Sequence, residues 1–328
     1  MKKTITNKRL DYIDWAKALS IFFIVIAHFL KEEHILRIML YSFHVPIFFL
    51  ISGILFKQNS FTKLFKRIII PYIFYYLVSS ILVIILDNKP VSILLDIFYF
   101  DGKLDLWNSV LWFLPCYYIV MNLMSILLRL FKDKIWVTLI VSIIISIFFF
   151  YNDTLRYFGL NKCILLYNYC CLGYLLKNVF TKVSLHKNNK TAIISFILFI
   201  LTLIVYGTIN QGNPISINGN DINNIIVYIL FSAAECILFL LALSCTKENR
   251  LIKIISNNTL FIMCTHLFFR ICLRKILNVS SLIYQLSGIF VFIFEILIVL
   301  CIAKCFKSNK INLKFLGLNI DKERDMAI

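Results

Sequence analysis

Three ionisable residues near the N-terminus have the spacing expected for one side of a single helix. At about 100° per residue, His28 returns to within roughly 20° of Lys17 and 40° of Asp14, and it lies about 16 Å along the axis from Lys17. An imidazole can act as a general base or as a nucleophile. The spacing therefore makes Asp14, Lys17 and His28 candidate catalytic residues.

Other ionisable side chains interrupt long apolar segments. His44 and His266 are two of these, and His44 is expected at a depth similar to that of His28, where the two could handle a proton together. The alternative is that each histidine only bonds a backbone carbonyl. Glu235 and Glu295 also lie within apolar segments, either as helix-packing hydrogen bonders or as parts of a polar path.

The composition determines which elements must position these residues. The chain has 328 residues, of which 60% are hydrophobic and only 16% charged, whereas soluble domains are roughly half apolar and about a quarter charged. A soluble fold of this length could not bury so much apolar surface, and disorder needs the opposite composition. We therefore expect an all-α polytopic membrane protein in a lipid bilayer.

A membrane-spanning helix needs about 20 mostly apolar residues. Ten segments fit: 15–31, 38–56, 68–86, 109–130, 135–151, 161–177, 191–207, 224–245, 259–274 and 284–305. We expect one membrane domain over residues 1–328, with a cytoplasmic N-terminal segment at 1–14 and a cytoplasmic tail at 306–328.

Lysine and arginine set the expected orientation, because cytoplasmic segments are rich in these residues. With the N-terminus in the cytoplasm, the cytoplasmic segments carry 25 basic residues and the opposite loops carry 9. This predicts that both termini are cytoplasmic. The net charge of +17 is then explained by topology and anionic lipid, so nucleic acid is not an expected partner.

Two further features concern ligand chemistry. The ten cysteines lie mostly in apolar segments with no CxxC pair, so we interpret them as packing residues and expect no metal site. A basic run, Lys57, Lys63, Lys66 and Arg67, precedes the third span. It is either a topology signal or a cradle for the phosphates of a cytosolic molecule.

Five motifs follow one another along the chain: Arg9-x4-Asp14-x2-Lys17-x10-His28 and the segments at 43–53, 66–72, 111–115 and 256–266. Their order resembles that of the acyltransferase-3 family of integral-membrane acyltransferases, and segment 43–53 is most similar to the fucose 4-O-acetylase-like branch. Two departures stand out. Lys17 replaces the more common arginine, and the paired-arginine motif of the third span reads Lys63-x-x-Lys66 with Arg67 beside it.

The resemblance implies a membrane O-acyltransferase, most simply an O-acetyltransferase, that uses cytoplasmic acyl-CoA to modify a carbohydrate at or beyond the outer leaflet of the plasma membrane. It implies that His28 is the general base or a transient acyl carrier, with His44 as a second catalytic residue. Acyl-CoA-binding residues would be Arg9, Lys63, Lys66 and Arg67. Acceptor-binding residues would be Trp112, which could instead be an interfacial anchor, and His266.

No permanently bound cofactor is expected, since acetyl-CoA acts as a donor substrate. Two other functions compete: a transporter or flippase for a lipid-linked sugar or polysaccharide, and a non-catalytic scaffold for polysaccharide assembly. Self-association, or association with polysaccharide-assembly proteins, is compatible with each of these functions. The sequence does not distinguish between acceptors, or between acetyl and succinyl groups.

Overall fold

The computed structural model describes residues 10–58, 60–98, 109–151, 159–183, 188–213, 215–219, 221–279, 281–305 and 316–318. Within these ranges the regular elements are helices, apart from one isolated bridge between Ser216 and Asp221. The α-helices are α1 (Asp11–Phe29), α2 (Ile35–Phe43), α3 (Pro46–Ile54), α4 (Phe61–Leu86), α5 (Phe113–Phe131), α6 (Ile135–Phe149), α8 (Leu160–Leu175), α9 (Lys177–Val183), α10 (Asn189–Ile209), α11 (Ile225–Ala242), α12 (Arg250–Asn257), α13 (Thr259–Ile276) and α14 (Leu282–Cys305). Three 3-10 helices accompany them: η1 (Val91–Phe98), η2 (Ser109–Trp112) and η3 (Lys132–Lys134).

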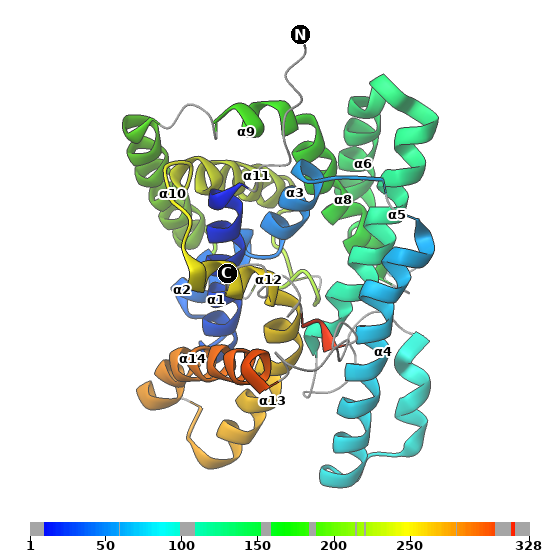
Figure 1. The fold of residues 1–328 in the computed structure, drawn as a ribbon, viewed down its shortest axis with the longest axis vertical. Coiled ribbons are helices and arrows are strands. Elements are labelled where there is room, and N and C mark those ends of the chain that lie inside the picture. The colour runs from blue at the N-terminus through cyan, green and yellow to red at the C-terminus, as the bar shows by residue number, and fades with distance from the viewer. Residues whose placement is uncertain are drawn as a thin grey trace.

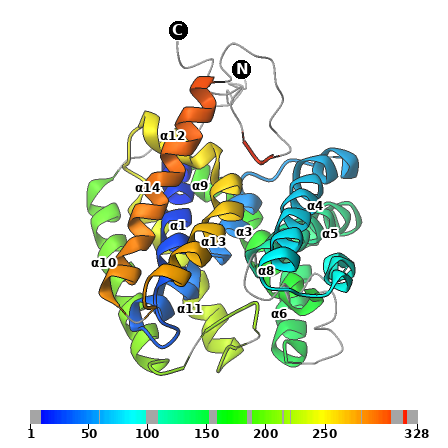
Figure 2. The same cartoon turned by 90° about the horizontal axis from the view of Figure 1, so that it is seen from below.

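The long helices form two groups that lie side by side (Figures 1 and 2). One group contains α3, α4, α5, α6 and α8, and the other contains α1, α2 and α10 to α14. Contacts of α3 with α1, α2 and α11 join the groups. A space between the groups can therefore be lined by residues from distant parts of the chain.

The closest helix crossing is between α3 and α8. A Cβ atom added at Gly53 would lie 1.9 Å from the backbone oxygen of Cys170, and one added at Gly173 would lie 2.0 Å from the backbone oxygen of Leu50. Small residues allow helix backbones to approach in this way, and van der Waals packing is a main source of helix association in membranes. The two glycines therefore fix α3, which follows the His44 segment, against α8 of the same helix group.

Polar side chains line the contact between α6 and α8. Ser142 donates to the Asn168 side-chain oxygen, and Asn168 Nδ2 donates to Ser146 Oγ at 3.1 Å. The hydroxyls of Thr138 and Tyr167 are 2.7 Å apart. Such bonds between helices satisfy polar groups that lipid cannot solvate. They explain why α8 is polar by sequence and buried within the protein.

Side-chain caps and prolines set several helix ends. Ser60, Asn188, Asn224 and Asn249 accept backbone N–H bonds at the starts of α4, α10, α11 and α12, as expected for residues of these types. Pro46 stands in the first turn of α3, where its missing N–H costs no hydrogen bond. The break at residues 44–45 thus divides the predicted span 38–56 into α2 and α3.

By length and apolar composition, seven helical segments in the described part of the chain can cross a membrane, with α2 and α3 counted together as one segment (Ile35–Ile54). The number is eight if the bent pair α12–α13 is one span. The sequence predicted ten. The difference comes from α6, an apolar helix of only 15 residues, from the polar helix α8, and from a 76° bend between α12 and α13. The predicted fold class, an all-helical protein with several candidate membrane spans, is confirmed, while ten crossings stay a prediction.

Several helix boundaries differ from the predicted ones. Helix α1 begins at Asp11, so Asp14 lies in its first turn rather than in a segment before it. The short helices η1, α9 and α12 were not predicted. Of the predicted tail at 306–328, the structure describes only residues 316–318.

Connecting segments gather into two faces. Near the start of α1, Tyr12 donates to the Phe180 carbonyl at 3.1 Å and Trp15 to the Lys247 carbonyl at 2.8 Å. We call this the N-terminal face. The segments after α1, after α4, before α5 and after α13 lie at the other end, which we call the cavity face. There Lys275 pairs with Asp87 at 3.9 Å, so the ends of α13 and α4 lie together.

Candidate active site

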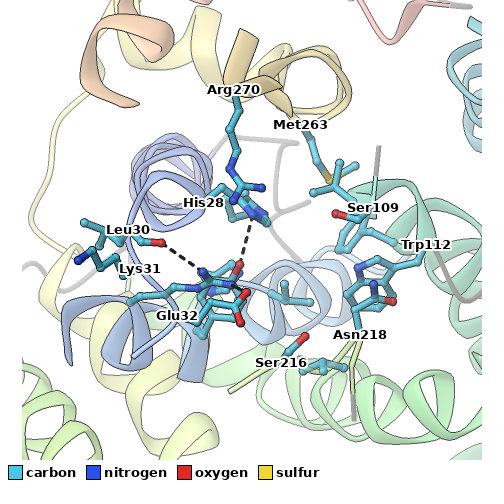
Figure 3. A pocket seen from close by; sticks show the side chains of 18 of the residues that line it. His28, Leu30, Lys31, Glu32, Ser109, Trp112, Ser216, Asn218, Met263 and Arg270 are labelled. Atoms are coloured by element: carbon cyan, nitrogen blue, oxygen red, sulfur yellow. Dashed lines mark hydrogen bonds and ion pairs between the residues drawn. The ribbon is translucent and has the colours of Figure 1, made fainter. Parts of the chain in front are cut away.

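A cavity of about 590 Å³ lies on the cavity face, where the two helix groups meet. Its walls come from the end of α1 with the following loop, from α2, from η2 and the start of α5, from segment 216–218, and from α13 with Val279 (Figure 3). The volume falls within the range of about 300–1,000 Å³ that is typical of small-molecule sites. Exposed residues Lys31, Glu32 and Glu33 form part of its rim.

His28 lies on the wall of this cavity, near the end of α1, and is partly exposed. Its Nδ1 is 3.3 Å from the hydroxyl of Tyr41 on α2. Its ring centroid is 5.2 Å from that of His266 on α13. Three helices therefore bring these three side chains together around His28.

Tyr41 joins His28 to His44. The rings of Tyr41 and His44 have centroids 4.6 Å apart, and both residues line the cavity. The Arg37 guanidinium lies 4.8 Å from the centre of the Tyr41 ring. Residues at i, i+4 and i+7 share one helix face, which accounts for the alignment of Arg37, Tyr41 and His44 along α2.

Two of the histidines also have the simple backbone contact that the sequence left open. Nδ1 of His44 lies 2.5 Å from the Leu40 carbonyl, and Nδ1 of His266 lies 3.0 Å from the Ile262 carbonyl. Since a carbonyl only accepts, each Nδ1 carries a hydrogen and each Nε2 of a neutral ring is an acceptor. Nε2 of His266 is buried without a hydrogen-bond partner.

Trp112 forms the wall on the other helix group. It is 8% exposed, lines the cavity, and lies 5.5 Å from the ammonium nitrogen of Lys162. Lys162 donates to the side-chain oxygen of Asn218 at 2.8 Å, which holds segment 216–218 beside the indole. Trp112 is thus packed within the protein beside the cavity.

The predicted residues are divided between two regions. The cavity brings together His28, His44 and Trp112, with His266 in contact with His28. Asp14 lies at the other end of α1, buried, and accepts a hydrogen bond from Ser256 Oγ at 2.6 Å. Lys17 is partly buried three helix turns before His28 and is not a lining residue.

None of the predicted acyl-CoA-binding residues is among the described lining residues of the cavity. Lys63, Lys66 and Arg67 are exposed in the first two turns of α4. Arg9 lies outside the described residues.

Arg37, Tyr41, Arg270 and Arg274 line the cavity but were not predicted from the sequence. A signal was present, because Arg270 and Arg274 follow His266 by one and two turns of one helix, and Arg37 and Tyr41 precede His44 with similar spacing. Both α13 arginines fall at the end of the predicted span 259–274.

The two buried glutamates lie outside the cavity lining and contact the helices that carry cavity histidines. Ser42 on α2 donates to Glu235 on α11, and Thr265 on α13 donates to Glu295 on α14 at 2.7 Å. One oxygen of each carboxyl group has no hydrogen-bond partner. These contacts favour the helix-packing interpretation of both residues.

The described residues contain no group of three or more His, Cys, Asp or Glu side chains that could hold a metal ion. What the cavity offers instead is an imidazole on its wall, an aromatic surface opposite, and hydrogen-bonding groups between them. This arrangement suits proton transfer to or from a small hydroxyl compound.

Comparison with known proteins gives one informative match. The sequence model of the family described as "Acyltransferase domain" (Acyl_transf_3) matches residues 10–305. No curated protein and no solved structure shows a significant match to the chain. Since the family match covers most of the sequence and all the long helices, the chain belongs to the acyltransferase-3 family.

Proposed function

We propose that the protein is an O-acyltransferase that moves an acyl group, most simply acetyl, from cytoplasmic acyl-CoA to a hydroxyl of an exported or surface carbohydrate. One observation carries this proposal: the His28 imidazole lies on the wall of a cavity of small-molecule size, with Tyr41 at its Nδ1 and Trp112 in the same cavity. The family match supports acyl transfer, and the arrangement supports a hydroxyl acceptor. The fucose 4-O-acetylase-like branch remains our assignment from segment 43–53.

We place the protein in the plasma membrane with ten crossings and both termini in the cytoplasm. The grouping of connecting segments into two faces supports an alternation of sides along the chain. The excess of lysine and arginine in the N-terminal-face segments supports a cytoplasmic position for that face. The cavity face is then outside, where a carbohydrate acceptor can reach His28.

The acyl donor would approach from the N-terminal face. Lys63, Lys66 and Arg67, with Arg9, would hold the phosphates of acyl-CoA, while Asp14 and Lys17 would lie at the cytoplasmic end of the path. A route past α5 is supported by two contacts. Ser52 donates to the Tyr117 hydroxyl at 3.0 Å, and the Tyr117 ring stacks 5.9 Å from Phe113, which lines the cavity.

Two reaction sequences fit His28. As a general base, Nε2 takes the proton of the acceptor hydroxyl while the hydroxyl oxygen attacks the thioester carbonyl. The C–S bond then breaks, and the departing CoA thiolate takes that proton from Nε2. As an acyl carrier, Nε2 attacks the thioester carbonyl, the C–S bond breaks, and CoA leaves as the thiolate. The acceptor hydroxyl then attacks the acyl-imidazole, the C–N bond breaks to free Nε2, and the hydroxyl proton balances the one that the CoA thiolate takes up. Both require an unprotonated Nε2, so Nδ1 must donate its hydrogen to the Tyr41 oxygen.

The other residues of the cavity would act on the acceptor. Trp112 offers an indole face on which a sugar ring can stack. Nε2 of His44 offers an acceptor for a sugar hydroxyl, and His44 can also relay a proton through Tyr41. His266, which the sequence suggested as an acceptor-binding residue, is buried outside the cavity lining and would act through its contact with His28.

The test is replacement of His28. His28→Ala should abolish acetylation of surface glycans, measured by mass spectrometry of glycans from cells carrying either form, while the membrane level of the protein is unchanged. His34→Asn is the matched control, since His34 lies outside the cavity lining and Asn can replace it as the cap of α2.

An experiment on the purified protein then distinguishes the two reaction sequences. With labelled acetyl-CoA and no acceptor, an acyl carrier retains label on the wild type but not on His28→Ala, whereas a general base retains none on either. Full activity of His28→Ala would remove the imidazole from the mechanism. Absence of any acyl-CoA turnover by the wild type would favour a transporter.

A further inference from the structure

Two arginines on α13 face the cavity and have no counterion among the described residues. Arg270 and Arg274 both line it, and Figure 3 shows Arg270 reaching from α13 towards His28. Neither has a hydrogen bond or ion pair within the described part of the chain, and Nε of Arg270 is buried without a partner. Arg270 is partly buried and Arg274 is exposed. A partly buried cation without a partner is costly, which marks Arg270 as a candidate for function.

The other charges of the cavity do not neutralise this pair. Its described lining contains four cations, Lys31, Arg37, Arg270 and Arg274, and two carboxylates, Glu32 and Glu33. Glu32 is already paired with Arg37 at 3.3 Å, and both glutamates are exposed at the rim. An excess of positive charge therefore remains on the α13 wall.

Arg37 differs from the α13 pair because both of its terminal nitrogens already donate to protein acceptors. Nη1 donates to the Leu30 carbonyl at 3.2 Å and Nη2 to Glu32, and the guanidinium stacks over Tyr41. Arg37 thus holds the loop after α1 against α2. Among the arginines that line the cavity, Arg270 and Arg274 have no protein acceptor in the described structure, and they lie one helix turn apart on the helix that carries His266.

Guanidinium groups recognise carboxylate and phosphate through paired hydrogen bonds. We propose that Arg270 and Arg274 bind an oxyanion carried by the acceptor, so that the substrate is an acidic carbohydrate: a sugar acid or a phosphate-bearing sugar or polyol. This inference rests on the proposed function, because it names the class of acceptor that occupies the same cavity. Bound there, the oxyanion would orient a neighbouring hydroxyl towards His28.

The experiment measures binding to the purified full-length chain in phosphatidylcholine nanodiscs, by isothermal calorimetry. Two matched pairs serve as probes: methyl glucuronide against methyl glucoside for carboxylate, and glycerol phosphate against glycerol for phosphate. We expect the acidic member of at least one pair to bind about tenfold more tightly than its neutral partner, because charge-assisted bidentate bonds are strong.

Arg270→Gln and Arg274→Gln should each reduce this preference, and Arg270→Lys should retain part of it. Lys275→Gln is the control: it removes the same charge from the same helix, but Lys275 is exposed, pairs with Asp87 and does not line the cavity. Thermal melting of every variant identifies any that fails to fold.

Equal binding of acidic and neutral probes by the wild type overturns the inference. So does an Arg270→Gln variant that loses turnover equally with acidic and neutral acceptors, or that raises KM only for acyl-CoA. A preference abolished by anionic phosphatidylglycerol in the nanodisc would assign the arginines to lipid headgroups. Because acyl-CoA turnover is measured separately, loss of the acidic preference with turnover intact leaves the proposed acyl transfer standing.

Discussion

The Tyr41 hydroxyl contacts one ring nitrogen of His28 and leaves the other available for chemistry. This hydroxyl lies 3.3 Å from Nδ1, and no other hydrogen bond of the His28 ring is found in the described structure. If Nδ1 donates to this oxygen, Nε2 is the basic atom. Because a hydroxyl both accepts and donates, Tyr41 supports this tautomer without excluding the other, and it need not touch either substrate.

Tyr41→Phe should therefore lower kcat at least about tenfold while leaving KM for acyl-CoA unchanged, because the ring stays and only the tautomer preference is lost. Steady-state kinetics of the purified variant measure this. Tyr284→Phe is a matched control, since the Tyr284 hydroxyl is buried without a hydrogen-bond partner. Equal kcat for Tyr41→Phe and the wild type would contradict the assignment.

At the scale of elements, the α3–α8 crossing fixes α3 within its helix group, and α3 in turn contacts α1, α2 and α11 of the other group. The contact at Gly53 is with backbone atoms of α8, which cannot move aside without moving the helix. At Gly207, an added Cβ would instead meet the flexible side chain of Met39 at 2.8 Å. The same substitution thus has different consequences at the two positions.

Gly53→Ala should destabilise the protein by about 1–3 kcal/mol, the usual range for overpacking, and lower its amount in the membrane. Gly207→Ala should have a smaller effect. Thermal melting in detergent compares the two variants. A melting temperature for Gly53→Ala equal to that of the wild type would show that the crossing is looser than described.

At the scale of the whole molecule, the two faces predict where reporters will function. Alkaline phosphatase fused after Asn88 or Asn213 should be active, because these positions follow α4 and α10 towards the outside. Fluorescent protein fused after Gln58 or Lys132 should fluoresce in the cytoplasm. The reverse pattern would invert the orientation and place the cavity in the cytoplasm.

The helices were predictable from sequence to the extent that lipid dictates them. Long apolar runs such as those of α10 and α14 must be helical, and both were expected close to their observed bounds, whereas α4 begins seven residues before the predicted span 68–86. The break before Pro46 was not predicted, because it occurs inside a segment with enough apolar residues for one span. The predicted span 259–274 begins where α13 does, but the helix α12 before it was not predicted.

The candidate site was predictable only in part. His28, His44 and Trp112 were recognised from chemistry and motif, and they share one cavity. Arg270 and Arg274 fall within the predicted span 259–274, but the sequence does not reveal that this part of α13 lines a cavity. Tyr41 has no unusual sequence context and becomes important only through its distance to His28.

The cavity has walls from both helix groups, with His28 on one side and Trp112 on the other. A ligand bound in the cavity contacts both helix groups, so its binding opposes their separation during unfolding. At a concentration 100 times its dissociation constant, such a ligand adds about 2.7 kcal/mol to stability. Heat resistance in the presence of candidate glycans thus becomes a search method for the natural acceptor, one that requires no turnover.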